Sequence, residues 1–328
     1  MQKLKVAFAG FRHGHIYALY DKMLKHPEIE IVAICEEDAP ASLLAKRPEI
    51  KLTDTDFDAM LKRVDCDVVA IGDYYTKRGP MTIRALKAGK HVIADKPLCT
   101  SLDELAEIES LAAKTGLKVG CMYELRFGVN FAAARELIKS GRLGKLLQIQ
   151  FGGQHPLQLA NRPGWYFEEG KHGGAINDIG SHALDVIPWM TGLKVAKIHG
   201  ARNWQANPGA GFLKEAGQFM LELDNGCGVV GDVSYASPDS FGFTLGTYWR
   251  FNIWGTLGMV EFNFAGPAPT VWFDGGKTGV PVELPAAPGD YLDSFLLDLA
   301  GRTPELDTAT VIESARRTLE VQLAADRA

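Results

Sequence analysis

The first 120 or so residues alternate short runs rich in β-branched side chains with segments of helical periodicity. No other feature of the sequence constrains the fold as strongly. Strands are expected at residues 4–9, 29–34, 68–71, 91–94 and 117–121, and helices at about 16–25, 81–88 and 101–114. Strands that alternate with helices are typical of a parallel sheet covered by helices. Residues 1–122 are therefore predicted to form an α/β domain.

From residue 123 the pattern changes to a Gly-rich middle and runs of alternating polarity. Helices are expected at about 130–139, 290–300 and 308–327, and strands at 146–151, 219–223, 229–235, 249–254, 258–264 and 270–273. Asp224-Asn225-Gly226 predicts a hairpin with a type I′ turn. Residues 123–328 are predicted to be an α+β domain with a large open, mainly antiparallel sheet. An open sheet exposes one face unless it is covered, so we expect a homodimer or homotetramer through it.

Composition narrows the class of partner. The 328 residues exceed the usual size of a single core, and the formal charge of −5 leaves no excess of cations for nucleic acid or an anionic membrane. The five cysteines form no Cys-x-x-Cys pair, which argues against a zinc site or a disulfide framework. No signal-like start or run of about 18 apolar residues is present. We expect a cytoplasmic protein that binds a small molecule.

The turn after the first strand lies where a dinucleotide-binding loop belongs. It reads Gly10-Phe11-Arg12-His13-Gly14-His15. In a Gly-x-Gly-x-x-Gly loop the second glycine lets the backbone approach the pyrophosphate; here Arg12 takes that place and His15 replaces the third glycine. The Arg12 guanidinium would compensate by binding phosphate. A plain strand-to-helix turn is an equally good interpretation of this loop alone.

Glu36, at the end of the second strand, lies 26 residues after Gly10. A carboxylate there accepts hydrogen bonds from both ribose hydroxyls and repels a 2′-phosphate. Glu37 and Asp38 follow, so NAD is favoured over NADP. Three solvated acids at a strand end are the alternative interpretation.

Asp95 and Lys96 follow the fourth strand directly. The carboxyl ends of parallel strands are where ligands bind in open α/β sheets. A lysine there would hydrogen-bond a substrate hydroxyl and stabilise the alkoxide, although a solvated lysine is common at such positions.

Residues 173–185 contain a Gly-Gly turn and then a helical segment. Asp178, His182 and Asp185 are spaced to share one helix face. Acid–base chemistry is the favoured explanation, because histidine titrates near neutrality and a carboxylate can orient its ring. A metal site that includes His172 is a weaker alternative. In a third interpretation, His182 is a buried, hydrogen-bonded histidine with a purely structural role.

Taken together, the chain resembles the glucose-fructose oxidoreductase, inositol dehydrogenase and MocA family of two-domain NAD(P)-dependent oxidoreductases. The matching stretches are residues 10–15, 85–92, 95–97, 126–127, 140–145 and 173–185. The resemblance implies a Rossmann-type first domain, a second domain for substrate binding and oligomerisation, and a catalytic set of Lys96, Asp178 and His182. It also places Asp73, Tyr74 and Asp95 at the cofactor and Arg126 at the substrate.

The departures from that family are local. Asp95 stands where the family usually has Glu, and residues 73–78 replace its Thr-Pro-Asn-x-x-His segment, which lies against the nicotinamide ribose. For a hydroxylated ring we expect contacts from aromatic faces and polar donors of the Gly-rich middle, namely His155, Arg162, Trp165, Tyr166, Lys171 and His172.

The leading hypothesis is a dehydrogenase that moves a hydride between NAD(H) and a CH–OH group of a sugar or cyclitol. His182 would take the hydroxyl proton, and Lys96 would stabilise the alkoxide. An NAD-dependent glycosidase that oxidises transiently, and a non-catalytic sensor of dinucleotide or sugar, are the alternatives.

Overall fold

The computed structural model describes residues 3–243 and 248–328, which divide into two compact units. The first runs up to Met122 and includes Tyr291–Ala315, whereas the second holds Tyr123–Asp290 and Arg316–Ala328. Residues 1–122 and 123–328 were the expected domains. Tyr291–Ala315, expected in the second domain, groups instead with the first unit.

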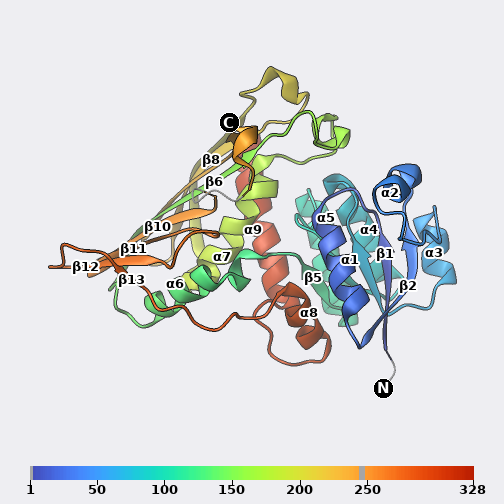
Figure 1. Ribbon diagram of the computed structural model, residues 1–328, viewed down its shortest axis with the longest axis horizontal. Coiled ribbons are helices and arrows are strands. Elements are labelled where there is room, and N and C mark those ends of the chain that lie inside the picture. Colours follow the sequence, from blue (N-terminus) through green and yellow to red (C-terminus); the bar gives the residue numbers. More distant parts are fainter. Residues whose placement is uncertain (1–2, 244–247) are drawn as a thin grey trace. The chain divides into compact units, whose positions relative to one another are not determined.

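Within the described residues, the first unit is built on a parallel sheet of five strands (Figure 1). These strands are β1 (Leu4–Ala9), β2 (Ile29–Cys35), β3 (Val68–Ile71), β4 (His91–Ala94) and β5 (Val119–Cys121). Their order is β2-β1-β3-β4-β5, so β1 lies between β2 and β3. The order reverses at this point, and ligands of such sheets bind beyond the carboxyl ends of the strands there.

Helices flank this sheet (Figure 1). They are α1 (His15–Lys25), α2 (Pro40–Lys46), α3 (Phe57–Arg63), α4 (Tyr75–Lys87), α5 (Leu102–Thr115) and α8 (Tyr291–Leu299). Helices α2 and α3 were not expected. Helix α4 begins six residues before the expected start at 81, because Pro80 lies within its first two turns and does not end it.

The late segment of the first unit completes the cover of β5. A Cβ on Gly120 would lie 2.7 Å from the Phe295 ring of α8. The Val119 N–H donates to Thr308 Oγ1 at 3.0 Å, and Lys118 Nζ donates to Asp298 at 2.8 Å.

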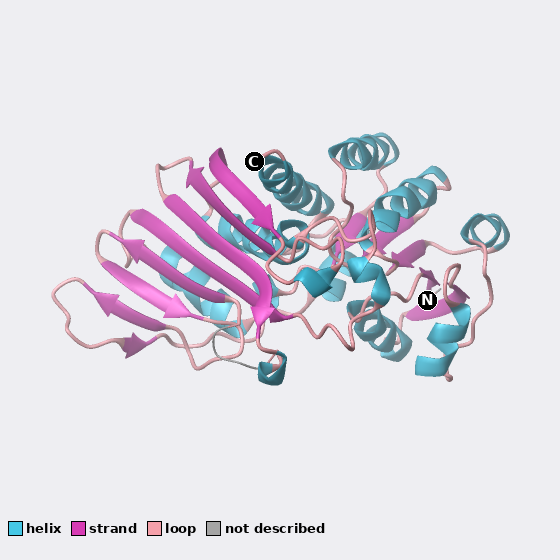
Figure 2. Ribbon diagram, turned by 90° about the horizontal axis from the view of Figure 1, so that it is seen from above, coloured by secondary structure: helices cyan, strands magenta, loops and turns pink. Residues whose placement is uncertain are grey.

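The part of the second unit that is described contains an eight-stranded sheet in the order β13-β12-β11-β10-β6-β9-β8-β7. The strands are β6 (Leu146–Pro156), β7 (Val195–Trp204), β8 (Ala216–Leu223), β9 (Gly228–Ser237), β10 (Arg250–Gly255), β11 (Gly258–Phe262), β12 (Thr270–Phe273) and β13 (Val280–Pro281). Only the β6–β9 pair is parallel among the pairs formed by described residues. Helices α6 (Val129–Lys139) and α7 (Ser181–Thr191) lie against one face (Figures 1 and 2). The expected fold class is confirmed; β7 and β13 were not expected.

The β8–β9 hairpin is present, but its turn differs from the expected type I′. That turn needs positive φ at two consecutive residues, whereas Gly226 has a φ of +84° and Asn225 is not in that region. The Gly226 N–H donates to Leu223 O at 2.8 Å, and the Leu223 N–H donates to Cys227 O at 2.8 Å. The β8–β9 loop is therefore longer than a two-residue type I′ loop and ends with a glycine in the left-handed conformation.

Two further observations concern the cysteines and the helices. All five cysteines are buried and free. Among the helices in the described ranges, none is both long and apolar enough to cross a bilayer.

Candidate functional site

The loop after β1 joins the carboxyl ends of three strands. The Gly10 N–H donates to Cys35 O at 2.9 Å, and the Arg12 N–H donates to Gly72 O at 3.0 Å. Gly10 has a φ of +78°, and a Cβ there would lie 2.6 Å from Asp73 Cβ. Gly14 precedes α1 with a φ of −64°, and a Cβ there would meet nothing within 4 Å. The loop therefore keeps open backbone at a helix amino terminus, where an anion binds favourably.

Glu36 holds this loop from the end of β2. Its Oε2 accepts the Phe11 N–H at 2.6 Å, and its Oε1 accepts the Ala39 N–H at 3.3 Å. Arg12 Nη1 lies 3.9 Å from Oε1. Burial raises the pKa of Glu36. Because each carboxylate oxygen has capacity for a second donor, Glu36 can also accept ribose hydroxyls, and the loop and carboxylate together fit a dinucleotide.

Asp73 follows β3 beside Gly10. It is buried, its Oδ1 accepts the Tyr74 N–H at 2.7 Å, and its Oδ2 lies 3.3 Å from Lys77 Nζ. Burial raises the pKa of Asp73. Lys77 also pairs with Glu37 at 2.7 Å and Asp38 at 2.9 Å. The sequence analysis did not single out Lys77, which neutralises part of the acidic cluster after β2.

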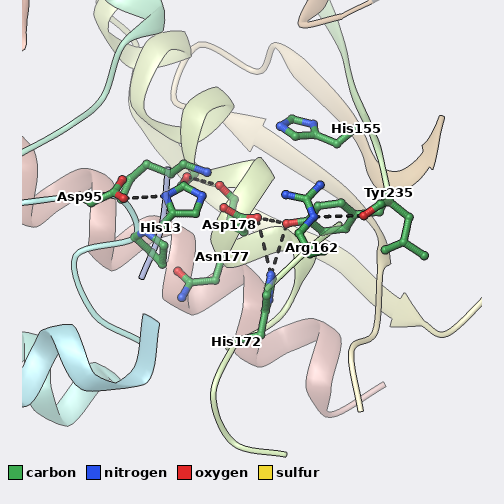
Figure 3. A network of polar contacts seen from close by, with 12 residues as sticks. His13, Asp95, His155, Arg162, His172, Asn177, Asp178 and Tyr235 are labelled. Atoms are coloured by element: carbon green, nitrogen blue, oxygen red, sulfur yellow. Dashed lines mark hydrogen bonds and ion pairs between the residues drawn. The ribbon is translucent and has the colours of Figure 1, made fainter. Parts of the chain in front are cut away.

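Asp95 is the centre of a buried network at the end of β4. Its Oδ2 lies 2.6 Å from His13 Nδ1 and 3.1 Å from Arg78 Nη2, and its Oδ1 lies 3.2 Å from His15 Nδ1. Figure 3 shows the His13 ring directed at the Asp95 carboxylate. Burial favours the neutral acid, but Arg78, then His13 and His15, hold the pKa of Asp95 well below its usual range. Burial lowers the pKa of His13 to about 4.

Arg78 connects the ends of β3 and β4. Its Nε donates to Asp73 O at 2.7 Å, and its Nη1 donates to Lys96 O. Its guanidinium also lies 4.6 Å from the centre of the Tyr75 ring. The side chain is fully buried. Arg78 therefore fixes the backbone of Lys96, whose own side chain is 3% exposed.

One group among the described residues brings metal-ligating atoms together, namely His13, His15 and Asp95, within 4.8 Å of one another. The Asp95 oxygens already receive hydrogen bonds from both rings and from Arg78. A divalent ion there would lie beside a guanidinium. We interpret the group as a hydrogen-bonded network that ties the loop to β4.

In the second unit, the segment before α7 is a π-helical turn, Ile176–Gly180, and not α-helix. A π turn closes i to i+5 bonds and changes the direction of the side chains that precede it. The expected common face of Asp178, His182 and Asp185 is accordingly divided. Asp185 forms a bidentate ion pair with Arg126, Nε to Oδ2 at 3.0 Å and Nη2 to Oδ1, and both side chains are about 1% exposed. The pair uses Nε and Nη2 of Arg126, and the expected contact of Arg126 with the substrate stays a prediction.

Asp178 contacts residues of a different set. The Tyr235 hydroxyl on β9 donates to Asp178 Oδ2, and His172 Nε2 lies 3.3 Å from Tyr235 Oη and 3.7 Å from Asp178 Oδ2. Figure 3 shows these three side chains meeting. Tyr235 was not among the residues predicted from the sequence. Its signal is the alternation of β9, in which residues 229, 231, 233 and 235 are buried.

Four other candidates of the second unit, His155, Trp165, Tyr166 and His182, are buried among aromatic rings, whereas Lys171 is partly exposed and pairs with Glu168 at 2.5 Å. The His182 ring lies 4.5 Å from the Trp249 ring, and His155 Nε2 lies 2.8 Å from Tyr248 Oη. Trp165 and Tyr166 lie 4.2 Å apart by ring centres. Trp249 has a φ of +53°, which is an outlier for a bulky residue and is found most often at functional positions.

Two family models match the chain. Residues 4–123 match an oxidoreductase family with an NAD-binding Rossmann fold, and residues 131–261 match the GFO/IDH/MocA C-terminal domain. Together the two matches account for most of the sequence and correspond to its two expected domains.

Curated relatives include dehydrogenases of sugars and cyclitols. D-glucoside 3-dehydrogenase of Escherichia coli (strain K12) is 30% identical over 196 residues, which are 58% of this chain and 54% of that protein. Inositol 2-dehydrogenase of Corynebacterium glutamicum is 28% identical over 237 residues, 71% of this chain and 63% of that protein. The matched region thus spans between half and two thirds of these relatives.

Solved structures share the fold along nearly the whole chain. Aldose-aldose oxidoreductase from Caulobacter crescentus, complexed with glycerol, has a TM-score of 0.79 and 21% identity, covering 99% of this chain and 98% of that one. An oxidoreductase from Agrobacterium radiobacter in complex with NAD+, L-tartaric acid and magnesium has a TM-score of 0.76 and 20% identity, covering 99% and 96%.

Proposed function

This chain belongs to the GFO/IDH/MocA family of oxidoreductases, and on that premise we propose that it transfers a hydride between NAD(H) and a CH–OH group of a sugar, cyclitol or related small polyhydroxylated molecule. The observation that carries the proposal is the joint presence of Lys96, Asp178 and His182, each at most 4% exposed. Buried ionisable side chains are costly unless they are paired or functional.

The roles follow from the chemistry of the three groups. Bound NAD+ supplies a hydride acceptor. The Lys96 ammonium would stabilise the alkoxide, and His182 would take the hydroxyl proton, because a neutral imidazole accepts a proton near pH 7. Asp178 would orient a substrate hydroxyl or His182. Burial of all three supports the proposal, because low dielectric strengthens each interaction.

For the cofactor, we assign the phosphates to the loop of residues 10–15 and the adenine ribose to Glu36. Asp73, Tyr74 and Asp95 would line the neighbouring strand ends. The buried carboxylate of Glu36 and the acids after it favour NAD over NADP, since a 2′-phosphate would be repelled there. Glu36 carries a hydrogen bond from the loop itself, so its charge and the shape of the loop are linked.

For the substrate, we assign contacts to His155, Trp165 and Tyr166, together with the three catalytic candidates. Aromatic faces and an imidazole suit a hydroxylated ring, which presents both C–H surfaces and hydroxyls. Arg126 stays a further candidate for the substrate, although Asp185 already accepts hydrogen bonds from its Nε and Nη2.

Replacement of His182 by alanine tests the proposal. We expect NADH formation with a panel of polyols and aldoses to fall by about 10²- to 10⁴-fold, the usual contribution of a general base. NAD affinity, measured by calorimetry, should stay within about threefold. His26→Ala, at the end of α1, is the matched control and should keep wild-type turnover. Unchanged turnover in His182→Ala would remove His182 from the mechanism.

We further propose that the protein acts in the cytoplasm as a homodimer or homotetramer. The outer face of the eight-stranded sheet supports assembly. Met220 and Val230 lie directly opposite each other on β8 and β9, and their side chains are 54% and 42% exposed. Exposed apolar residues that lie side by side on an open sheet face are typical of an interface.

A further inference from the structure

We infer that Tyr235 is a positioning residue for Asp178, and that His172 completes a hydrogen-bonded chain which holds the Asp178 carboxylate for the proposed reaction. The inference rests on the proposed function and names two side chains to which that function assigns no role. Both are buried: Tyr235 is 3% exposed and His172 is 4% exposed.

The direction of the chain follows from its donors and acceptors. A carboxylate only accepts, so the hydroxyl proton of Tyr235 goes to Asp178 Oδ2. The lone pairs of Tyr235 Oη remain available on the other side, and His172 Nε2 lies 3.3 Å away. With its proton on Nε2, His172 donates to Tyr235 Oη. The order is therefore His172 to Tyr235 to Asp178.

The surrounding structure fixes each member of this chain. The Arg162 guanidinium lies 5.1 Å from the Tyr235 ring centre and 4.8 Å from that of Tyr166, and it is itself held by the carbonyls of residues 156 and 157. The Tyr166 ring lies 4.8 Å from the His172 ring. These contacts restrict both rings.

The backbone conformation before Asp178 also positions this residue next to Tyr235. Gly173 and Gly174 both have positive φ, +83° and +94°, and turn the chain between His172 and the π-helical turn. Gln322 of α9 (Thr308–Asp326) accepts the Asn177 N–H at 3.0 Å and leaves no room for a Cβ on Gly174. The Gly-Gly turn and Gln322 thus both fix the position of the π-helical turn that carries Asp178. Tyr235 contacts the Asp178 carboxylate itself.

A double-mutant cycle between Tyr235→Phe and Asp178→Asn tests the inference. Tyr235→Phe removes one oxygen and keeps the ring against Arg162. We expect kcat to fall by about ten- to a hundredfold, the effect of one hydrogen bond to a charged group, with NAD affinity unchanged. In the Asp178→Asn background the same change should reduce kcat by less than about threefold, because its target is already altered.

Three further variants separate positioning from general packing. His172→Gln keeps an N–H donor and should retain more activity than His172→Leu. Tyr291→Phe makes the same chemical change at a buried tyrosine of the first unit and should leave kcat within about twofold of wild type.

The outcomes distinguish the inference from the function on which it depends. The inference is overturned if the kcat losses of Tyr235→Phe and Asp178→Asn multiply fully in the double variant. It is also overturned if the two His172 variants are equally active. Neither result contradicts the proposed dehydrogenase activity. If the wild type fails to reduce NAD with every polyol tested, the proposed function is overturned. In that case urea unfolding still reports the contact: the midpoint shift from Tyr235→Phe must shrink in the Asp178→Asn background, and an unchanged shift shows that Tyr235 does not hold Asp178.

Discussion

Gly10 is the residue at which backbone conformation and close packing coincide. Its φ of +78° is left-handed, and a Cβ would meet Asp73 at 2.6 Å. A left-handed alanine alone costs about 1–2 kcal/mol, and the clash adds to it. We predict that Gly10→Ala lowers the free energy of unfolding by more than about 2 kcal/mol, as measured by urea unfolding, and weakens NAD binding.

Gly14→Ala is the natural control, because its Cβ would stand in open space with a right-handed φ. Its stability should stay within about 0.5 kcal/mol of wild type. NAD affinity should nevertheless fall, since the added methyl would face the phosphates that we assign to this loop. Full NAD affinity in Gly14→Ala would contradict that assignment.

His13 makes the first unit sensitive to acid. Burial lowers its pKa from 6.5 to about 4, so the unfolded chain takes up this proton first. The stability provided by neutral His13 is complete above about pH 6.5 and is lost as the pH falls toward 4, and that drop in pKa corresponds to about 3 kcal/mol. Asp95 loses its charge only at lower pH, because its pKa is held well below 3.8.

His13→Gln keeps a donor for Asp95 but cannot titrate. We therefore predict that urea midpoints of the wild type fall more between pH 7 and 4.5 than those of His13→Gln. Equal falls in the two proteins would show that His13 is not held neutral by burial.

At the scale of elements, periodicity located most of the regular structure. Strands β1, β3 and β4 have their expected bounds. Each contains a run of three or four consecutive apolar residues, a length typical of a buried strand. Helices α2 and α3, with seven residues each, are too short for a periodic pattern. The clearest local signal of α3 is its N-cap, Asp56, whose side chain accepts the Ala59 N–H.

The sequence predicts the main residues of the candidate site, but it does not predict the side chains that these residues contact. Lys96, Asp178 and His182 stand out by motif. The contacts of Arg78 with Asp95 and of Tyr235 with Asp178 join positions 17 and 57 residues apart, and no local pattern encodes such pairs. The π-helical turn before α7 is also invisible to a 3.6-residue period, which is why Asp185 was grouped with Asp178.

At the scale of the whole molecule, the outer sheet face carries a prediction about assembly. Met220→Lys with Val230→Glu places opposite charges across β8 and β9, a pairing that an antiparallel sheet tolerates. We predict a dimer or tetramer for the wild type by light scattering and a shift toward monomer for this double variant. Leu24→Lys, at an exposed position of α1, should leave the mass unchanged. A monomeric wild type would contradict the proposed assembly.

The cover of β5 by α8 has a consequence for biosynthesis. A ribosome adds about 5–20 residues per second, and about 170 residues separate Cys121 from Phe295. In the nascent Rossmann sheet, β5 therefore stays uncovered for on the order of ten seconds or longer. During that interval the apolar edge is open to chaperones and to strands of other chains, so yield in cells depends on how fast translation reaches α8.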